Sequence, residues 1–309
     1  MPAYRLTPSL HITPWGGDRL KAYGKASESN TLGESWELSF VPGAESRLAD
    51  GRPVSEVFGR ESFGTHAENL PFFPVLTKFI DAARDLSVQV HPSDTYALAH
   101  EGQYGKCEMW YILDAAPNAG IYLGLTSTVD AEILRRAALD GTAQHLLRFF
   151  PVKRGESYLI PPGTVHAIGA GVLLFEIQEN STLTYRLYDY GRLGTDGKPR
   201  PLHLEKALEV ATLSPYEPPR PASDDPTLIG LTPYFETHVY KKNFTKKSLF
   251  VDKASFLSLT VTVGEGTIDG QKCTVGDTFF LPAGSGETEI FGDLTVVAVS
   301  LPKEKPQEG

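Results

Sequence analysis

GESYLIPPGTVH, residues 155–166, joins a glycine, a short apolar run, a Pro-x-Gly turn and a histidine. The same frame returns as GDTFFLPAGSGE at residues 276–287, with a glycine, five residues, a proline, any residue, a second glycine, two residues and a polar side chain. A single segment of this kind would be a common strand-and-turn pattern. Two copies in register predict a chain built from two related β modules.

Length and composition limit the protein classes to consider. The chain has 309 residues, more than the ~100 to 200 of a usual single domain, so two domains or one large β unit are expected. Its 23 prolines and 29 glycines imply many turns. The net charge of -9 argues against a nucleic-acid surface or an anionic membrane face as the main partner.

Nothing in the sequence indicates secretion. Two cysteines, Cys107 and Cys273, are too few for a disulfide framework, and the N-terminal MPAYRLTPSLHITPW lacks the apolar core of a signal peptide. No apolar run is long enough to span a bilayer. We therefore expect a cytoplasmic protein without nucleic-acid or membrane partners, either a monomer or a weak homodimer.

Short runs bounded by turn residues predict mostly strands; ESWELSFV, LSVQVH, EMWYIL and GVLLFEIQ are examples. Helical patterns are fewer and comprise SDTYALAHEG, LHLEKALEVATL and a two-helix insertion at about residues 127–150. The proline-rich segment at residues 214–227 predicts an extended linker. The expected organisation is a large β domain at residues 1–213, the linker, and a small β domain at residues 228–309.

The repeated frame resembles the second motif of the cupin fold, a double-stranded jelly roll. In that family the Pro-x-Gly turn directs the final histidine into the mouth of the barrel as a metal ligand. The first copy keeps this ligand as His166, whereas the second has Glu287. The resemblance implies a mainly β fold of two cupin-type jelly-roll modules with a small helical insertion, the first module with a metal and the second without.

Strand alternation places polar side chains in the interior of the first module. In SVQVH, the side chains of Ser87, Gln89 and His91 share one face, and two valines share the other. In KCEMW, Lys106 and Glu108 share a face with a tryptophan, while Cys107 points to the opposite side and is expected to be buried packing.

These strands and the histidine of the turn supply a candidate metal site. Two imidazoles, one carboxylate and one amide oxygen suit a single divalent cation, and the nitrogen-rich mixture favours zinc. The expected ligands are Gln89, His91, Glu108 and His166. The remaining histidines lack such neighbours and are interpreted as surface or local hydrogen-bonding residues: His11, His66, His100, His145, His203 and His238.

Longer stretches resemble the type I mannose-6-phosphate isomerases in their short bacterial form. They are LTKFIDAARDLSVQVHPSD, GKCEMWYIL, PPGTVHAIGAGVLLFEIQENSTLTYRLYDYGR and RPLHLEKAL, with PWGGDRL and GESWELSFVPG nearer the N-terminus. Together these stretches cover roughly Pro14 to Leu213, and the C-terminal module is similar only in general pattern.

The resemblance implies a function and a set of site residues. The expected activity is a zinc-dependent interconversion of mannose 6-phosphate and fructose 6-phosphate through an enediol, with one zinc ion per chain. The ligand set is the one given above, and Arg186 is expected at the active site with Lys106 and Glu108 flanking the sugar. Lys78 and Ser87 are the expected phosphate contacts.

One position departs from the family pattern. Where many relatives have an aspartate before the active arginine, this chain has Thr182. Either that carboxylate is dispensable, or Glu179, Asp189 or a water replaces it. The proton carrier is therefore open, and Lys106 or a metal-bound water is the preferred hypothesis.

Two other functions remain as alternatives. A cupin that binds a sugar or sugar phosphate without catalysis is the first, although Lys106 and Arg186 beside a full ligand set favour an enzyme. A metal-dependent oxygenase is the second, and it would prefer two histidines and one carboxylate without the additional Gln89.

Overall fold

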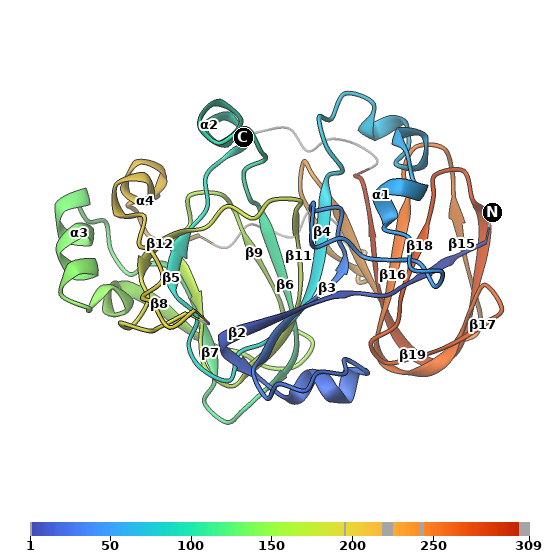
Figure 1. Ribbon diagram of the computed structural model, residues 1–309, viewed down its shortest axis with the longest axis horizontal. Helices are drawn as coiled ribbons and strands as arrows, with labels where there is room; N and C mark the ends of the chain where they lie inside the picture. Colours follow the sequence, from blue (N-terminus) through green and yellow to red (C-terminus); the bar gives the residue numbers. More distant parts are fainter. Residues whose placement is uncertain (1, 195, 218–224, 242–243, 303–309) are drawn as a thin grey trace.

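The computed structural model describes residues 2–194, 196–217, 225–241 and 244–302, so residues 218–224 of the expected linker lie outside the described part. Among the described residues the strands form three sheets whose neighbouring strands are antiparallel. The sheets follow one another across the molecule, with helices α3 and α4 at one end and the C-terminal strands at the other (Figure 1). The mainly β fold is therefore confirmed.

A six-stranded sheet lies in the middle of the molecule. Its order is β2 (Ser9–Gly17), β3 (Leu32–Leu38), β4 (Val75–Asp81), β11 (Val172–Glu179), β6 (Glu108–Ala115) and β9 (Ser157–Ile160). A five-stranded sheet stands on one side of it, in the order β12 (Tyr185–Tyr188), β5 (Val88–Val90), β10 (His166–Ile168), β7 (Gly120–Leu125) and β8 (Leu147–Pro151).

An eight-stranded sheet stands on the other side and holds the C-terminal strands. Its main path is β1 (Tyr4–Leu6), β18 (Thr278–Leu281), β16 (Leu257–Ile268), β19 (Gly286–Ser300), β14 (Glu236–Lys241) and β13 (Leu228–Leu231), while β15 (Phe244–Val251) pairs with β19 and β17 (Gln271–Thr274) with β16. The N-terminal strand β1 thus belongs to the C-terminal sheet, so the two parts of the chain are joined by strand pairing as well as by the linker.

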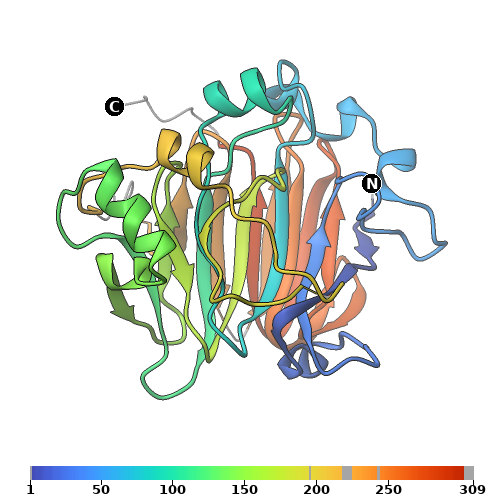
Figure 2. The ribbon, with the colours of Figure 1, turned by 60° about the vertical axis from the view of Figure 1, so that its left-hand side comes forward.

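Helices are short and lie outside the sheets. They are α1 (Val54–Val57), α2 (Asp94–His100), α3 (Ala131–Leu139) and α4 (Leu204–Val210), with 3-10 helices η1 (Arg19–Tyr23), η2 (Arg60–Ser62), η3 (Thr65–Ala67) and η4 (Ala143–Leu146). Figure 2 shows α3 and α4 together on the outer side of the five-stranded sheet. No helix among the described residues has the length and apolar character needed to cross a membrane.

The segment at residues 127–150 differs from the expected pair of helices. Asp130 caps α3 by accepting a hydrogen bond from the backbone N–H of Ile133. The second helix is only the 3-10 turn η4, after which β8 begins and pairs with β7. Aromatic residues suit a strand better than a helix, so Phe149 and Phe150 explain the change.

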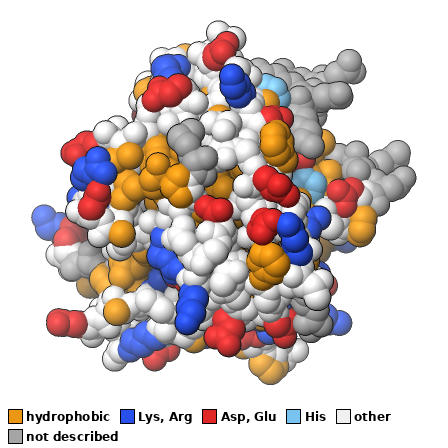
Figure 3. Space-filling view, turned by 90° about the vertical axis from the view of Figure 1, so that its right-hand side faces the viewer, with side chains coloured by type: hydrophobic (Ala, Val, Ile, Leu, Met, Phe, Trp, Pro, Cys, Tyr) orange, Lys and Arg blue, Asp and Glu red, His pale blue; other side chains and the backbone are white. Residues whose placement is uncertain are grey.

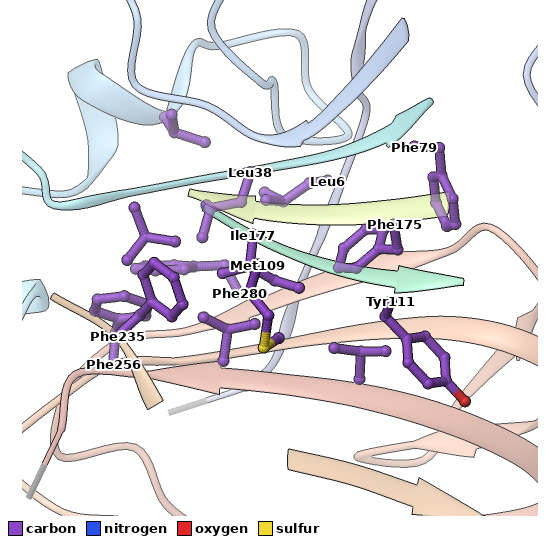
Figure 4. Packing of buried hydrophobic residues seen from close by; sticks show 14 of the residues in the cluster. Leu6, Leu38, Phe79, Met109, Tyr111, Phe175, Ile177, Phe235, Phe256 and Phe280 are labelled. Carbon is purple, nitrogen blue, oxygen red and sulfur yellow. The ribbon is translucent and has the colours of Figure 1, made fainter. Parts of the chain in front are cut away.

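Period-two alternation gives the central sheet two different faces. Met109 and Tyr111 of β6 and Phe175 and Ile177 of β11 point toward the C-terminal sheet and pack there with Phe280 and other buried residues (Figure 4). The alternate positions point toward the five-stranded sheet, where apolar residues form a second core. The polar residues on this second face are those of the candidate site.

The two repeated frames adopt the same local form. Each contains a strand, β9 or β18, followed by a turn and a second strand, β10 or β19. Gly155 and Gly276 have φ of 89° and 92°, and Gly163 and Gly284 have φ of 84° and 77°, a backbone region that favours glycine. The frames end differently: His166 is buried, whereas Glu287 is exposed.

Candidate active site

A cavity of about 190 Å³ lies between the central and five-stranded sheets. It is lined by six residues expected from the sequence, namely Lys78, Ser87, Gln89, Lys106, Glu108 and Arg186. His91 and His166 lie directly behind it and contact Glu108. The site is therefore built by two sheets whose strands are not paired with each other.

On the five-stranded sheet, strand pairing places His166, Gln89 and Arg186 in a row. Gln89 of β5 is paired with His166 of β10 on one side and with Arg186 of β12 on the other. Directly paired residues point to the same face of a sheet. Val88 and Val90 occupy the opposite face and pack beneath the helices, as the alternation predicts.

His91, Glu108 and His166 are buried, and one possible ligand atom from each lies within 4.8 Å of the other two. His91 Nε2 is 3.2 Å from Glu108 Oε1, and His166 Nε2 is 3.6 Å from Glu108 Oε2. The Nδ1 atoms point away and donate to backbone carbonyls, at 2.7 Å to Leu183 O and 2.9 Å to Thr164 O. Each Nε2 is therefore left with a lone pair that faces the carboxylate.

This donor set fits a divalent cation. His91 Nε2 is buried and has no hydrogen-bond partner among the described residues. Burial lowers the pKa of His91 to about 3 and also lowers the pKa of His166, so both rings are neutral at pH 7. Although burial opposes it, the positive charge of Lys106 and contact with His91 hold the pKa of Glu108 well below its usual range. Two neutral imidazoles and an ionised carboxylate are the protonation states that metal binding requires.

Gln89 stands at the edge of this group. Its Nε2 lies 3.2 Å from His166 Nε2, and its Oε1 accepts a hydrogen bond from Ser87 Oγ at 3.1 Å. A half-turn of the amide about its last bond exchanges the two atoms and presents the oxygen to the site. Gln89 is thus within reach of a cation held by the three buried residues.

Next to this group, acidic and basic side chains alternate in a row across the central sheet. Lys78 Nζ lies 3.4 Å from Glu34 Oε2 and 3.8 Å from Glu176 Oε1. Lys106 Nζ lies 2.7 Å from Glu108 Oε1 and 3.9 Å from Glu176 Oε1. Lys78 is therefore deep in the cavity between two carboxylates, and Lys106 joins this group to the group formed by His91, Glu108 and His166.

Glu176 was not anticipated from the sequence, and its buried, charged environment shifts its pKa toward neutrality. Burial, followed by the charge of Glu108, raises its pKa to about 7, even though both lysines act in the opposite direction. A carboxyl group with a pKa near neutrality can both accept and donate a proton under physiological conditions.

Two arginines line the opposite part of the cavity. Arg200 is held by Asp189 through contacts of 2.7 and 2.6 Å, which fix its guanidinium. Arg186 is half-buried, and its Nε has no hydrogen-bond partner among the described residues. Burial and the neighbouring Arg200 lower the pKa of Arg186. Two cations with incompletely satisfied donors make this part of the cavity suited to an anion.

Thr182 stands where many relatives have an aspartate. Thr182 lines the cavity and its hydroxyl contacts Gln103 at 3.4 Å. The two carboxylates considered as replacements lie elsewhere: Glu179 accepts a hydrogen bond from the backbone N–H of Cys107, and Asp189 is paired with Arg200. Neither residue lines the cavity, whereas Glu176 does.

Most residues outside the cavity follow the sequence expectations. His100 and His238 bond residues close in sequence, His203 accepts a hydrogen bond from the backbone N–H of Arg186, and Cys107 is buried. His66 is exposed, but its hydrogen bond is not local, because its Nδ1 bonds the distant Pro302 O. His11 packs against Trp36, with ring centroids 4.2 Å apart.

No protein-family model matches the chain. A mannose-6-phosphate isomerase of Streptococcus mutans serotype c is 36% identical over 314 residues, covering 95% of this chain and 96% of that protein. A mannose-6-phosphate isomerase of Bacillus subtilis strain 168 is 38% identical over 296 residues, covering 90% and 92%. The crystal structure of mannose 6-phosphate isomerase from Bacillus subtilis matches with a TM-score of 0.87 at 33% identity, covering 97% of this chain and 99% of that chain. The similarity therefore extends through the C-terminal sheet, beyond the stretches quoted from the sequence.

Proposed function

The chain belongs to the mannose-6-phosphate isomerase family and is an aldose–ketose isomerase. We propose that it interconverts mannose 6-phosphate and fructose 6-phosphate through an enediol intermediate, with one zinc ion per chain. The observation that carries this proposal is the meeting of three kinds of group in one cavity. They are a buried group of side chains that could hold a metal ion, a carboxyl group with a pKa of about 7, and two cations.

The proposed zinc ligands are Gln89, His91, Glu108 and His166. A zinc ion held there supplies polarisation of the sugar oxygens next to the reacting carbons. Zinc suits two imidazole nitrogens and a carboxylate better than calcium or magnesium, which prefer oxygen ligands. We further propose that each β module is a cupin-type barrel and that only the first holds a metal, because Glu287 replaces the histidine and is exposed.

The reaction requires a group that moves a proton between adjacent carbons. The aldose loses the proton on C2 and the ketose gains one on C1, while the hydroxyl proton passes from O2 to O1. We propose that Glu176, with Lys106 beside it, carries the carbon-bound proton. The 3.9 Å separation of Lys106 Nζ from Glu176 Oε1 lets the ammonium stabilise the carboxylate while Glu176 is ionised.

Arg186 supplies positive charge for the oxygen that becomes negative in the enediol. Arg200 and Ser87 are proposed to contact the phosphate, because Arg200 is fixed by Asp189 and Ser87 is on the same wall as Gln89. Lys78 was expected to share this role from sequence resemblance. Because Lys78 lies between Glu34 and Glu176, we propose that it also lowers the pKa of Glu176.

The test is conversion of mannose 6-phosphate to fructose 6-phosphate by the purified protein. Activity should fall after chelator treatment and return on addition of zinc, while magnesium added in its place should not restore it. Full activity in a chelated sample with no remaining metal would refute the zinc requirement. Absence of turnover in the zinc-loaded protein, with sugar phosphate still bound, would favour the non-catalytic binding protein instead.

A further inference from the structure

The C-terminal sheet contains a cavity of its own, separate from the catalytic one. Its volume is about 320 Å³, within the ~300 to 1,000 Å³ usual for small-molecule sites. It lies at one end of the core of that sheet: Val251 and Ala298 belong to this core, and Leu249 and Leu257 pack against it. The cavity therefore has an apolar floor.

Polar groups form one wall of this cavity. On β14, Glu236 Oε1 and His238 Nε2 are 2.7 Å apart, and His238 Nδ1 is 3.0 Å from Thr227 Oγ1. Tyr240, two residues further, stacks in parallel with His238 at a centroid distance of 5.8 Å. The hydroxyls of Ser248 and Ser300 complete the wall. These contacts hold the histidine and the carboxylate in place before any ligand arrives.

The rim of the cavity is apolar and shared by both halves of the chain. Phe250 is 76% exposed yet lines the cavity, so its ring is available to a ligand. His66 also lines it and bonds Pro302 O through Nδ1 at 2.9 Å, while the backbone N–H of His66 donates to Ala254 O. The N-terminal segment containing η3 thus forms part of a site on the C-terminal sheet.

The charges around the cavity select a class of ligand. No lysine or arginine in the described part of the chain lines it, whereas Glu236 and Asp252 do, so a phosphate or other anion is disfavoured. Figure 3 shows acidic and basic side chains interspersed over this side of the molecule, without a large region of one sign. A carboxylate and several hydroxyls can pair with the hydroxyl groups of a ligand, and an exposed aromatic ring can cover the C–H face of a sugar ring.

We propose that this cavity binds a neutral monosaccharide of the aldohexose class. The sugar ring packs over Phe250 and the apolar floor, and its hydroxyls meet the Glu236 carboxylate and the hydroxyls of Ser248 and Ser300. The sugar differs from the proposed substrate of the catalytic cavity in lacking the phosphate, which is assigned there to Arg200 and Ser87. The proposal does not depend on the catalytic role of any residue.

The test is calorimetric titration of the zinc-loaded protein with mannose and with glucose, in the presence of saturating sugar phosphate so that the catalytic cavity is filled. One of the two hexoses should bind saturably at one site per chain. Phe250→Ala and Glu236→Gln should each weaken that binding by about tenfold, as expected when about 1.4 kcal/mol is lost. Leu139→Ala is the matched control for Phe250→Ala, since Leu139 is 70% exposed on α3, and it should bind as the parent does.

Isomerase turnover is measured on the same samples and should be unchanged in all three variants, so a fault in the catalytic proposal would be seen separately. Absence of saturable binding by the parent protein would overturn the inference. Binding that is equally strong in Phe250→Ala and Glu236→Gln would overturn it as well, because the hexose would then occupy another place.

Discussion

Replacement of Glu176 by glutamine tests the raised pKa of this carboxyl group in the cavity. The pKa of Glu176 is raised from 4.5 to about 7, chiefly by burial and then by Glu108. At 1.36 kcal/mol for each pKa unit, ionising this group in the folded protein costs about 3 kcal/mol more than in the unfolded chain. Glutamine has nearly the same shape and cannot ionise, so it removes that cost.

The sign of the effect follows from which state holds the proton. The unfolded chain releases it near pH 4.5, whereas the folded protein keeps it until about pH 7. The stabilisation from this group is therefore complete below pH 4.5, declines between 4.5 and 7, and is absent above 7. Relative to the parent, Glu176→Gln should gain about 3 kcal/mol of stability between pH 4.5 and pH 8.

The assay is urea denaturation of the metal-free parent and of metal-free Glu176→Gln, each at pH 4.5 and at pH 8. Glu287→Gln, a change at an exposed glutamate of the C-terminal sheet, controls for the loss of a charge itself. Zinc-loaded Glu176→Gln should also lose about 10² to 10⁴ in turnover, the usual contribution of a proton-transfer group. A stability difference between parent and Glu176→Gln that is the same at both pH values would refute the assigned ionisation, and parent-like turnover would refute the proton-transfer role.

Three further changes test the remaining parts of the molecule. His166→Ala should reduce bound zinc and turnover together, as metal analysis and the isomerase assay will show, and full metal with full activity would disprove the ligand assignment. Arg186→Ala should lower turnover and leave the zinc content near that of the parent, whereas loss of zinc would identify a structural role. Lys25→Met should lower the free energy of unfolding by about 3 to 5 kcal/mol, since Lys25 and Glu37 are 6% and 1% exposed and 2.9 Å apart. Parent-like stability of Lys25→Met in urea would contradict this, and adding Glu37→Gln should restore part of the loss.

Local patterns were enough to predict much of the site. Alternation along SVQVH and KCEMW correctly placed Gln89 and Glu108 on polar interior faces, because side-chain direction in a strand repeats every two residues. The turn at His166 was predictable for a similar reason, since glycines at positive φ and prolines fix its path locally. The mainly β class followed from the same short-range signals.

Glu176 and Arg200 could not be assigned in this way. Glu176 interrupts an apolar run of β11, which is a visible signal, but its partners come from β4 and from the segment before β6. Arg200 lies in a loop, and only its pairing with Asp189 brings it to the cavity. Long-range pairing of this kind has no local sequence pattern.

The sequence by itself determined the strand content, the repeated turn and the set of side chains able to bind a metal, because each depends on residues close together along the chain. Only the tertiary structure decided which carboxylate has a pKa near 7, which cations line the cavity, and that β1 and η3 attach the N-terminal part of the chain to the C-terminal sheet. Those properties depend on burial and on charges contributed by several strands, and burial exists only once the sheets have packed.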